Sequence, residues 1–112
     1  MKREDFKRVK ELPFEFDKVS AGFHFKQIRN DNGWYIYEVT TQGGSKWYEV
    51  FKERVVKDMS YDKENCKFIN SSENGHIAYP SDECFGSWAW NVISIEYAED
   101  IIKKKSYLIN IN

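Results

Sequence analysis

Cys84 is the candidate nucleophile of this sequence, inside the stretch HIAYPSDECFGSWAW at residues 76–90. A thiol nucleophile needs a base and an orienting partner, and the chain's two histidines, His24 and His76, are the available bases. The residues around Cys84 match no cysteine-hydrolase signature. The sequence therefore favours an inert thiol and predicts that the protein is not an enzyme.

A metal site is the second chemistry that this stretch suggests, because His76, Asp82, Glu83 and Cys84 are all ligand types. Three of them are consecutive and the histidine stands alone, without the paired spacing of structural zinc sites. Gly43-Gly44 also lacks the Lys-Ser/Thr and the helix that follow a phosphate-binding loop. We therefore predict no metal and no cofactor.

The same stretch also fits a structural corner. Tyr79-Pro80 favours an extended or turning backbone, and Gly86 relieves crowding just before Trp88. On this interpretation the corner delivers Trp88 and Trp90 into the core. The alternative, a binding or reactive loop, stays open at this point.

Length and composition predict one domain over residues 1–112, since this is a common size for a single core. Residues are 41% hydrophobic, 31% charged and 17% aromatic, so rings should dominate the packing. Seventeen basic and eighteen acidic residues give a net charge of −1, without the excess that marks nucleic-acid binding. The N-terminal residues 1–12 lack the apolar run of a signal peptide or membrane span. We expect a cytoplasmic protein that does not bind membranes, with Cys66 and Cys84 reduced.

Three predicted strands, in which side chains alternate between the two faces of a sheet, should form the centre of the fold. They run over approximately 22–30, 33–41 and 46–56, and are rich in aromatic and β-branched side chains. Asn32-Gly33 and residues 42–45 supply the turns between them, which predicts an antiparallel meander.

The remaining elements are shorter. Phe6, Val9 and Leu12 have a spacing typical of a short helix that ends at Pro13, and a polar loop over residues 57–80 contains one short strand at 66–69. A further strand at 88–92 should carry both tryptophans on one face.

A C-terminal helix over 94–105, capped by Ser94, is the clearest element. Its apolar stripe is Ile95, Ala98, Ile101 and Ile102, and acidic residues precede basic ones. Residues 106–112 should form a short strand or a loose tail. The predicted fold is α+β, a mainly antiparallel sheet of the three-strand meander plus one or two further strands, packed against this helix.

Large rings occur on both faces of the meander. The helix should cover one face, and the other is too apolar to be left in water over a wide area. The chain's own residues 1–20 and 57–80, a second subunit or a ligand should cover it. As binding residues we select Trp34, Tyr37, Trp47 and Tyr48, where alternation separates Trp34 from Tyr37 and Trp47 from Tyr48. The leading function is therefore protein–protein interaction, including self-association.

The alternative function is single-stranded nucleic-acid binding, in which exposed rings stack on bases and cations follow the phosphates. The cations on these strands are Lys26, Arg29, Lys46, Lys52 and Arg54. Glu38, Glu49 and Glu53 intersperse them and weaken the electrostatic case. An excess of basic side chains on one sheet face would favour this alternative.

Two segments carry a resemblance, KWYEVFKERVV at 46–56 and YPSDECFGSWAW with SIEYAEDI at 79–101. Together they resemble small uncharacterised proteins of bacteriophages and mobile elements of gut Bacteroidetes, including crAss-like phages. The resemblance covers about a third of the chain and matches nothing before residue 44. It implies an accessory or virion-associated protein made in a bacterial cytoplasm, and no site residue.

Overall fold

The computed structural model describes residues 2–69 and 73–111, which form two compact units. Unit 1 comprises Met1–Leu12 and Glu53–Tyr79, and unit 2 comprises Pro13–Lys52 and Pro80–Asn112. The α+β fold, with mainly antiparallel sheets and a C-terminal helix on a sheet, is confirmed. The single domain over residues 1–112 stays a prediction.

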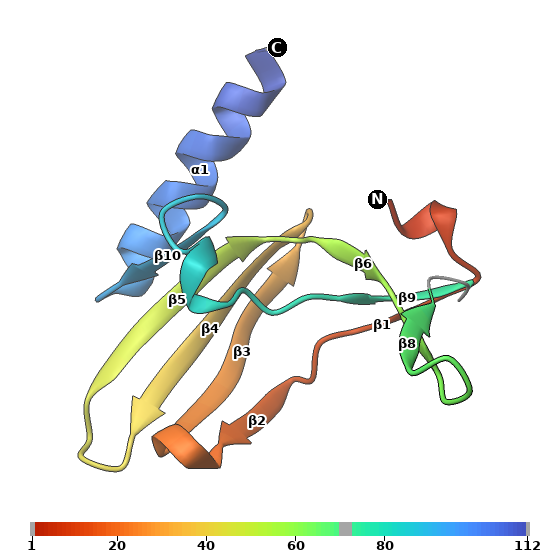
Figure 1. Ribbon diagram of the computed structural model, residues 1–112. Coiled ribbons are helices and arrows are strands. Elements are labelled where there is room, and N and C mark those ends of the chain that lie inside the picture. The colour runs from red at the N-terminus through yellow and green to blue at the C-terminus, as the bar shows by residue number, and fades with distance from the viewer. Residues whose placement is uncertain (1, 70–72, 112) are drawn as a thin grey trace. The chain divides into compact units, whose positions relative to one another are not determined.

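Unit 2 is built on a five-stranded antiparallel sheet with the order β10-β5-β4-β3-β2 (Figure 1). Its strands are β2 (Glu15–Lys18), β3 (Phe23–Asp31), β4 (Trp34–Thr41), β5 (Lys46–Lys52) and β10 (Ala89–Val92), and the short 3-10 helices η2 (Val19–Ala21) and η3 (Asp82–Cys84) lie in its connections. The predicted meander is β3-β4-β5. Asn32 and Gly33, with φ of 52° and 79°, make the tight turn expected between β3 and β4.

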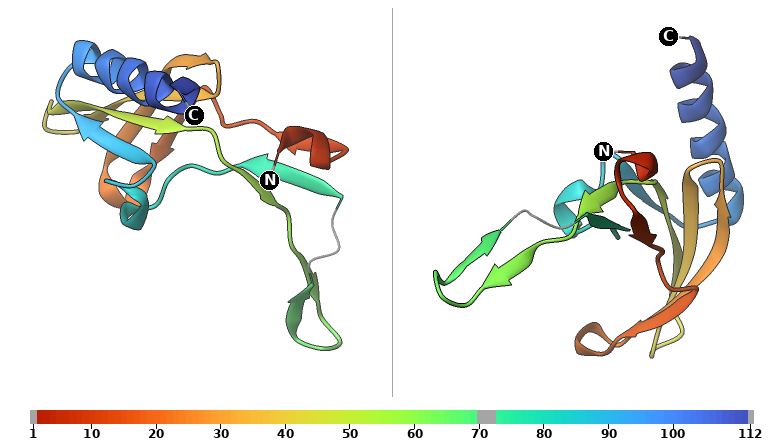
Figure 2. Two further views of the ribbon diagram at one scale, coloured as in Figure 1. Left: turned by 90° about the horizontal axis from the view of Figure 1, so that it is seen from above. Right: turned by 90° about the vertical axis from the view of Figure 1, so that its right-hand side faces the viewer.

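The helix α1 (Ile95–Ile111) covers one face of this sheet (Figure 1 and the left view of Figure 2). The Ser94 hydroxyl accepts a hydrogen bond from the Tyr97 backbone N–H at 3.2 Å, so the predicted cap is confirmed. Ala98 and Ile102 are buried, among the helix residues 95–106 whose side chains are described. The predicted strand or tail over 106–112 is wrong, because no proline or glycine interrupts the backbone ladder and the helix continues to Ile111.

The opposite face of the sheet is packed with rings. Tyr35 and Phe51 stack with centroids 5.3 Å apart, and Tyr37 stacks on Phe51 at 5.9 Å. Trp88 meets Phe51 edge-on at 6.3 Å, whereas Trp90 lies beside Trp34 on the helix face. The expectation that both tryptophans share one face is therefore wrong. Trp88 precedes β10, so strand alternation does not fix its direction.

Unit 1 has a three-stranded sheet with the order β1-β9-β6. β1 (Arg8–Lys10) is parallel to β9 (Asn74–Ile77), and β6 (Val55–Lys57) is antiparallel to it. β7 (Ser60–Asp62) pairs with β8 (Lys67–Ile69), so the short strand expected at 66–69 is present. The prediction of a loop with a single strand over 57–80 is wrong, because β7 and β9 lie in the same range and pair with partners that the local sequence does not reveal. The strand predicted over 46–56 is two strands, because β5 ends at Lys52 and β6 belongs to the other unit.

The helix expected over residues 6–12 is wrong. A 3-10 turn, η1 (Arg3–Asp5), and the strand β1 occupy this region. Pairing with β9, far away in the sequence, overrides the local three-residue spacing. A Cβ at Gly75 would lie 3.1 Å from the Phe6 ring, so Phe6 packs closely on β9 at a position where a larger residue would force its neighbours to move.

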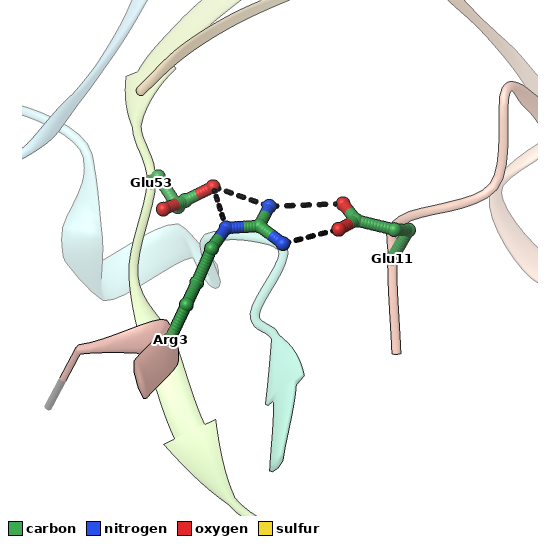
Figure 3. A network of polar contacts seen from close by, with 3 residues as sticks. All are labelled: Arg3, Glu11 and Glu53. Atoms are coloured by element: carbon green, nitrogen blue, oxygen red, sulfur yellow. Dashed lines mark hydrogen bonds and ion pairs between the residues drawn. The ribbon is translucent and has the colours of Figure 1, made fainter. Parts of the chain in front are cut away.

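An arginine joins three segments of unit 1. The Arg3 guanidinium binds Glu11 in a two-pronged ion pair and donates to Glu53 Oε1 at 2.6 and 3.0 Å (Figure 3). Hydrogen bonds from Arg3 to Glu11 and then to Glu53 raise the pKa of Arg3. Arg3 therefore connects η1 to the end of β1 and to the segment before β6.

Candidate functional site

Three of the four rings selected from the sequence are core residues. Trp34 and Tyr48 pack beneath α1 with Ile36 and Val50. Tyr37 is fully buried on the other face, where its hydroxyl donates to the Pro13 carbonyl at 2.6 Å. Burial raises the pKa of Tyr37, which keeps the phenol neutral. Rings that the chain itself buries offer no area to a partner, so these three are not the contact residues of the folded monomer.

Trp47 is the partly exposed member of the set. Its indole N–H donates to Glu49 Oε2 at 3.0 Å, and its ring meets Phe23 edge-on at 5.1 Å. Alternation separates Trp34 from Tyr37 and Trp47 from Tyr48, as predicted. The indole completes the edge of the ring-packed face, which is a structural role.

The two histidines bind carboxylates. His24 Nδ1 lies 2.5 Å from Asp17 and His24 Nε2 lies 2.7 Å from Glu15, while His76 Nδ1 lies 2.6 Å from Asp58 in unit 1. Both ring nitrogens of His24 are therefore occupied by carboxylates on β2. Hydrogen bonds to Asp17 and then to Glu15 raise the pKa of His24, so the imidazolium form is favoured.

Neither Cys66 nor Cys84 takes part in a disulfide in the described part of the chain, and Cys84 Sγ lies 3.4 Å from the Ser81 hydroxyl. Among the residues that the structure describes, no three His, Cys, Asp or Glu side chains are grouped to hold a metal ion. No helix in the described ranges 2–69 and 73–111 is long and apolar enough to cross a membrane.

An open cavity of about 390 Å³ lies at the end of the sheet beside η2. Its lining is about equally polar and apolar and includes Asp17, Phe23, His24, Thr40 and Gln42. The two charged side chains of this lining are already paired with each other. The charged side chains that line the cavity therefore bind each other, which leaves neither of them to select a charged ligand.

The two edges of the unit 2 sheet differ sharply in charge. The edge strand β2 reads Glu-Phe-Asp-Lys, with three charges in four residues. The opposite edge, from Trp88 through Ile95, reads WAWNVISI and carries no charge. Charged side chains on an edge strand discourage pairing with another chain, so β2 is protected and β10 is not.

Part of the β10 backbone directs its N–H and C=O groups away from β5, toward the outer edge of the sheet. The Lys52 N–H donates a hydrogen bond to the Trp88 carbonyl oxygen, so these two residues form a hydrogen-bonded pair of the ladder between β5 and β10. The next pairs of this kind are Trp90 with Val50 and Val92 with Tyr48. In an antiparallel ladder the intervening residues direct their N–H and C=O groups away from the partner strand. Asn91 therefore presents both backbone groups at the edge.

A loop of the same chain covers only the start of β10. The N–H of Gly86 donates to the Ala89 carbonyl at 2.7 Å, and Phe85 bridges Ala89. Neither contact reaches Asn91. Within β10, Asn91 is therefore the open outward-facing residue, and Ile93 directly follows the end of the strand at Val92.

Exposed apolar side chains lie next to this edge of the sheet. Ile93 is 80% exposed and Tyr97 is 60% exposed. Tyr97 and Glu99 point to opposite sides of α1, since two residues turn the helix by about 200°. Glu99 binds Arg29 of β3, so Tyr97 faces the side of the helix toward β10. We name Asn91, Ile93 and Tyr97 the edge surface.

Sequence reasoning missed the edge surface. The sequence predicted a strand at 88–92 with Trp88 and Trp90 in the core, and its local pattern does not show which strand ends the sheet. Two signals were present: the run of eight uncharged residues from Trp88 to Ile95, and Tyr97 as a large ring outside the predicted stripe of α1.

Comparison with known proteins gives no relative: no protein-family model, no curated protein and no solved structure matches this chain.

Proposed function

We propose that this chain is a non-enzymatic binding protein that acts through contact with protein at the edge surface. The observation that supports the proposal is the difference between the two sheet edges, because β2 is charged whereas β10 is uncharged, open and flanked by exposed Ile93 and Tyr97. Main-chain pairing at a free edge gives affinity, and the neighbouring side chains give specificity. An accessory role in a phage or mobile element stays a prediction of the resemblance.

The nucleic-acid alternative has weaker support. On the face of the sheet that α1 covers, four basic side chains and the imidazolium of His24 accompany four acidic ones: Lys26, Arg29, Lys46 and Lys52 with Glu15, Asp17, Asp31 and Glu38. Asp17 and Glu15 already bind His24, so the charges of this face nearly balance. Of the rings on this face, Trp34 and Tyr48 are buried and Trp90 is partly buried against them, so little ring area is left to stack on bases.

Site-specific photo-crosslinking in expressing cells tests the proposal. A photoreactive phenylalanine analogue replaces Tyr97, and in a control variant it replaces Val19, an exposed apolar residue next to β2. We expect discrete protein adducts from position 97 and none from position 19. Equal adducts at both positions, no adducts, or adducts to nucleic acid would contradict protein binding at the edge surface.

A further inference from the structure

We infer that the partner at the edge surface is a second copy of this chain, joined through antiparallel pairing of β10 with β10. This inference rests on the proposed function and names its partner. A twofold axis near Val92 places Asn91 of each copy opposite Ile93 of the other, the residue that directly follows β10. Pairing extends β10 by this one residue, so that each Asn91–Ile93 pair exchanges two main-chain hydrogen bonds, about four in the dimer.

The distribution of apolar groups favours a second copy over a lone strand. The edge surface spans two layers, because Asn91 belongs to the edge strand, Ile93 directly follows it, and Tyr97 belongs to the helix. A single added strand pairs with the backbone of Asn91 but leaves Tyr97 without cover. A second copy brings its own strand and helix in the same relative placement, so symmetry supplies both layers at once.

Electrostatics do not oppose this association. The β10 edge carries no charge from Trp88 to Ile95. On the same side of α1 as Tyr97, Lys104 Nζ binds Asp100 Oδ2 at 2.9 Å within the chain. Two copies can therefore approach without placing unpaired like charges face to face.

The two ends of the sheet give the dimer a defined size. Pairing at β10 makes one continuous sheet whose outer edges are the two β2 strands. Each outer edge carries Glu15, Asp17 and Lys18, which protect it from further pairing. The assembly therefore closes at two copies rather than growing into a fibre.

Sedimentation equilibrium of the full chain from about 5 µM to about 500 µM, a range suited to a short interface, tests the inference. Wild type should pass from monomer to dimer across this range. Ile93→Lys places two like charges at the interface and should weaken the dimer at least about tenfold. The control Val19→Lys, at a residue 87% exposed beside the other edge, should dimerise as wild type does. Circular dichroism verifies that both variants are folded.

Amide hydrogen exchange provides an independent measurement. The amide of Asn91 should become protected as the concentration rises, because it donates to the second copy. The amide of Asp17 points outward at the β2 edge, since Gln27 N–H donates to the Phe14 carbonyl and sets the ladder, and its exchange should not change.

The outcomes separate the inference from the proposed function. A wild type that remains monomeric throughout the range overturns the inference, as does a dimer that Ile93→Lys leaves unchanged. Adducts from position 97 to a different protein, together with a monomeric wild type, keep protein binding and reject self-association. The absence of both adducts and dimer rejects both.

Discussion

The rings of Trp34 and Trp90 lie 6.4 Å apart with their planes inclined by 33°, on the face of the sheet that α1 covers. Lys105 Nζ lies 5.1 Å from the centroid of the Trp90 ring. Strand β4, strand β10 and the helix therefore meet at one aromatic pair, which makes this pair a test of the helix-on-sheet packing.

Replacement of Trp34 by Ala should destabilise the protein by about 3–5 kcal/mol, because the ring is buried and the cavity it leaves is lined by fixed neighbours. The control Tyr97→Ala removes a mostly exposed ring and should cost about 0.5 kcal/mol or less in the monomer. Chemical denaturation of both variants at low concentration measures the difference. Equal midpoints for the two variants would show that Trp34 is not a core residue.

Gly75→Ala should destabilise unit 1 by about 1–3 kcal/mol. The added Cβ would lie 3.0 Å from the Val56 carbonyl oxygen and 3.1 Å from the Phe6 ring, and the carbonyl belongs to the paired strand and cannot move freely. Gly43→Ala is the matched control, because its Cβ would meet only Thr41 Oγ1 at 3.9 Å. Hydrogen exchange of β6 and β9 should accelerate in the first variant alone, and unchanged exchange would mean that the close packing is absent.

Arg3→Ala should loosen β1, because the Arg3 guanidinium holds both Glu11 and Glu53. These groups are partly exposed, so we expect about 1 kcal/mol at low salt and less as salt screens the pairs. Lys7→Ala, which removes a fully solvated pair with Glu73, is the control and should have little effect. A loss of stability that is equal for both variants, or independent of salt, would contradict a specific role for Arg3.

The pKa of His24 should lie above its ordinary value of 6.5, and Asp17→Asn should lower it more than Glu15→Gln, because Asp17 is the larger cause. Since the folded state favours the imidazolium, its stabilisation is complete below pH 6.5 and is lost as the pH rises through the raised pKa. An NMR titration of the His24 ring, followed by unfolding of wild type and Asp17→Asn across the same window, measures both effects. A pKa of 6.5 or below for His24 in wild type would show that Asp17 and Glu15 do not bind the charged ring.

Local signals predicted β3, β4, β5, β10 and α1 of unit 2, but not the edge strand β2. The alternating pattern, the Asn32-Gly33 turn and the Ser94 cap each depend on neighbouring residues, and each marks its element correctly. The unit 1 strands depend on partners far away in the chain. Phe6 has a helical spacing with Val9, yet it packs on Gly75, and nothing local identifies that partner.

The candidate site was harder to predict for a different reason. Exposure of a ring depends on which strand ends the sheet and which side of α1 it occupies. Large size and aromaticity directed the selection toward Trp34, Tyr37 and Tyr48, and the same properties place those rings in the core. Ile93 and Tyr97 lie at a boundary that becomes visible only when the strand order β10-β5-β4 is known.

Each unit is built from two separate segments of the chain, which affects the order in which the chain can fold during synthesis. β1 leaves the ribosome early, but its partner β9 follows only after the whole β2–β5 segment has emerged. The β2–β5 segment can pair within itself at once, yet its ring-packed and helix-covered faces wait for Trp88 and α1. A nascent chain therefore exposes a partly formed sheet until Trp88 and α1 have been translated, so stepwise folding along the chain gives way to a late, concerted closure of this unit.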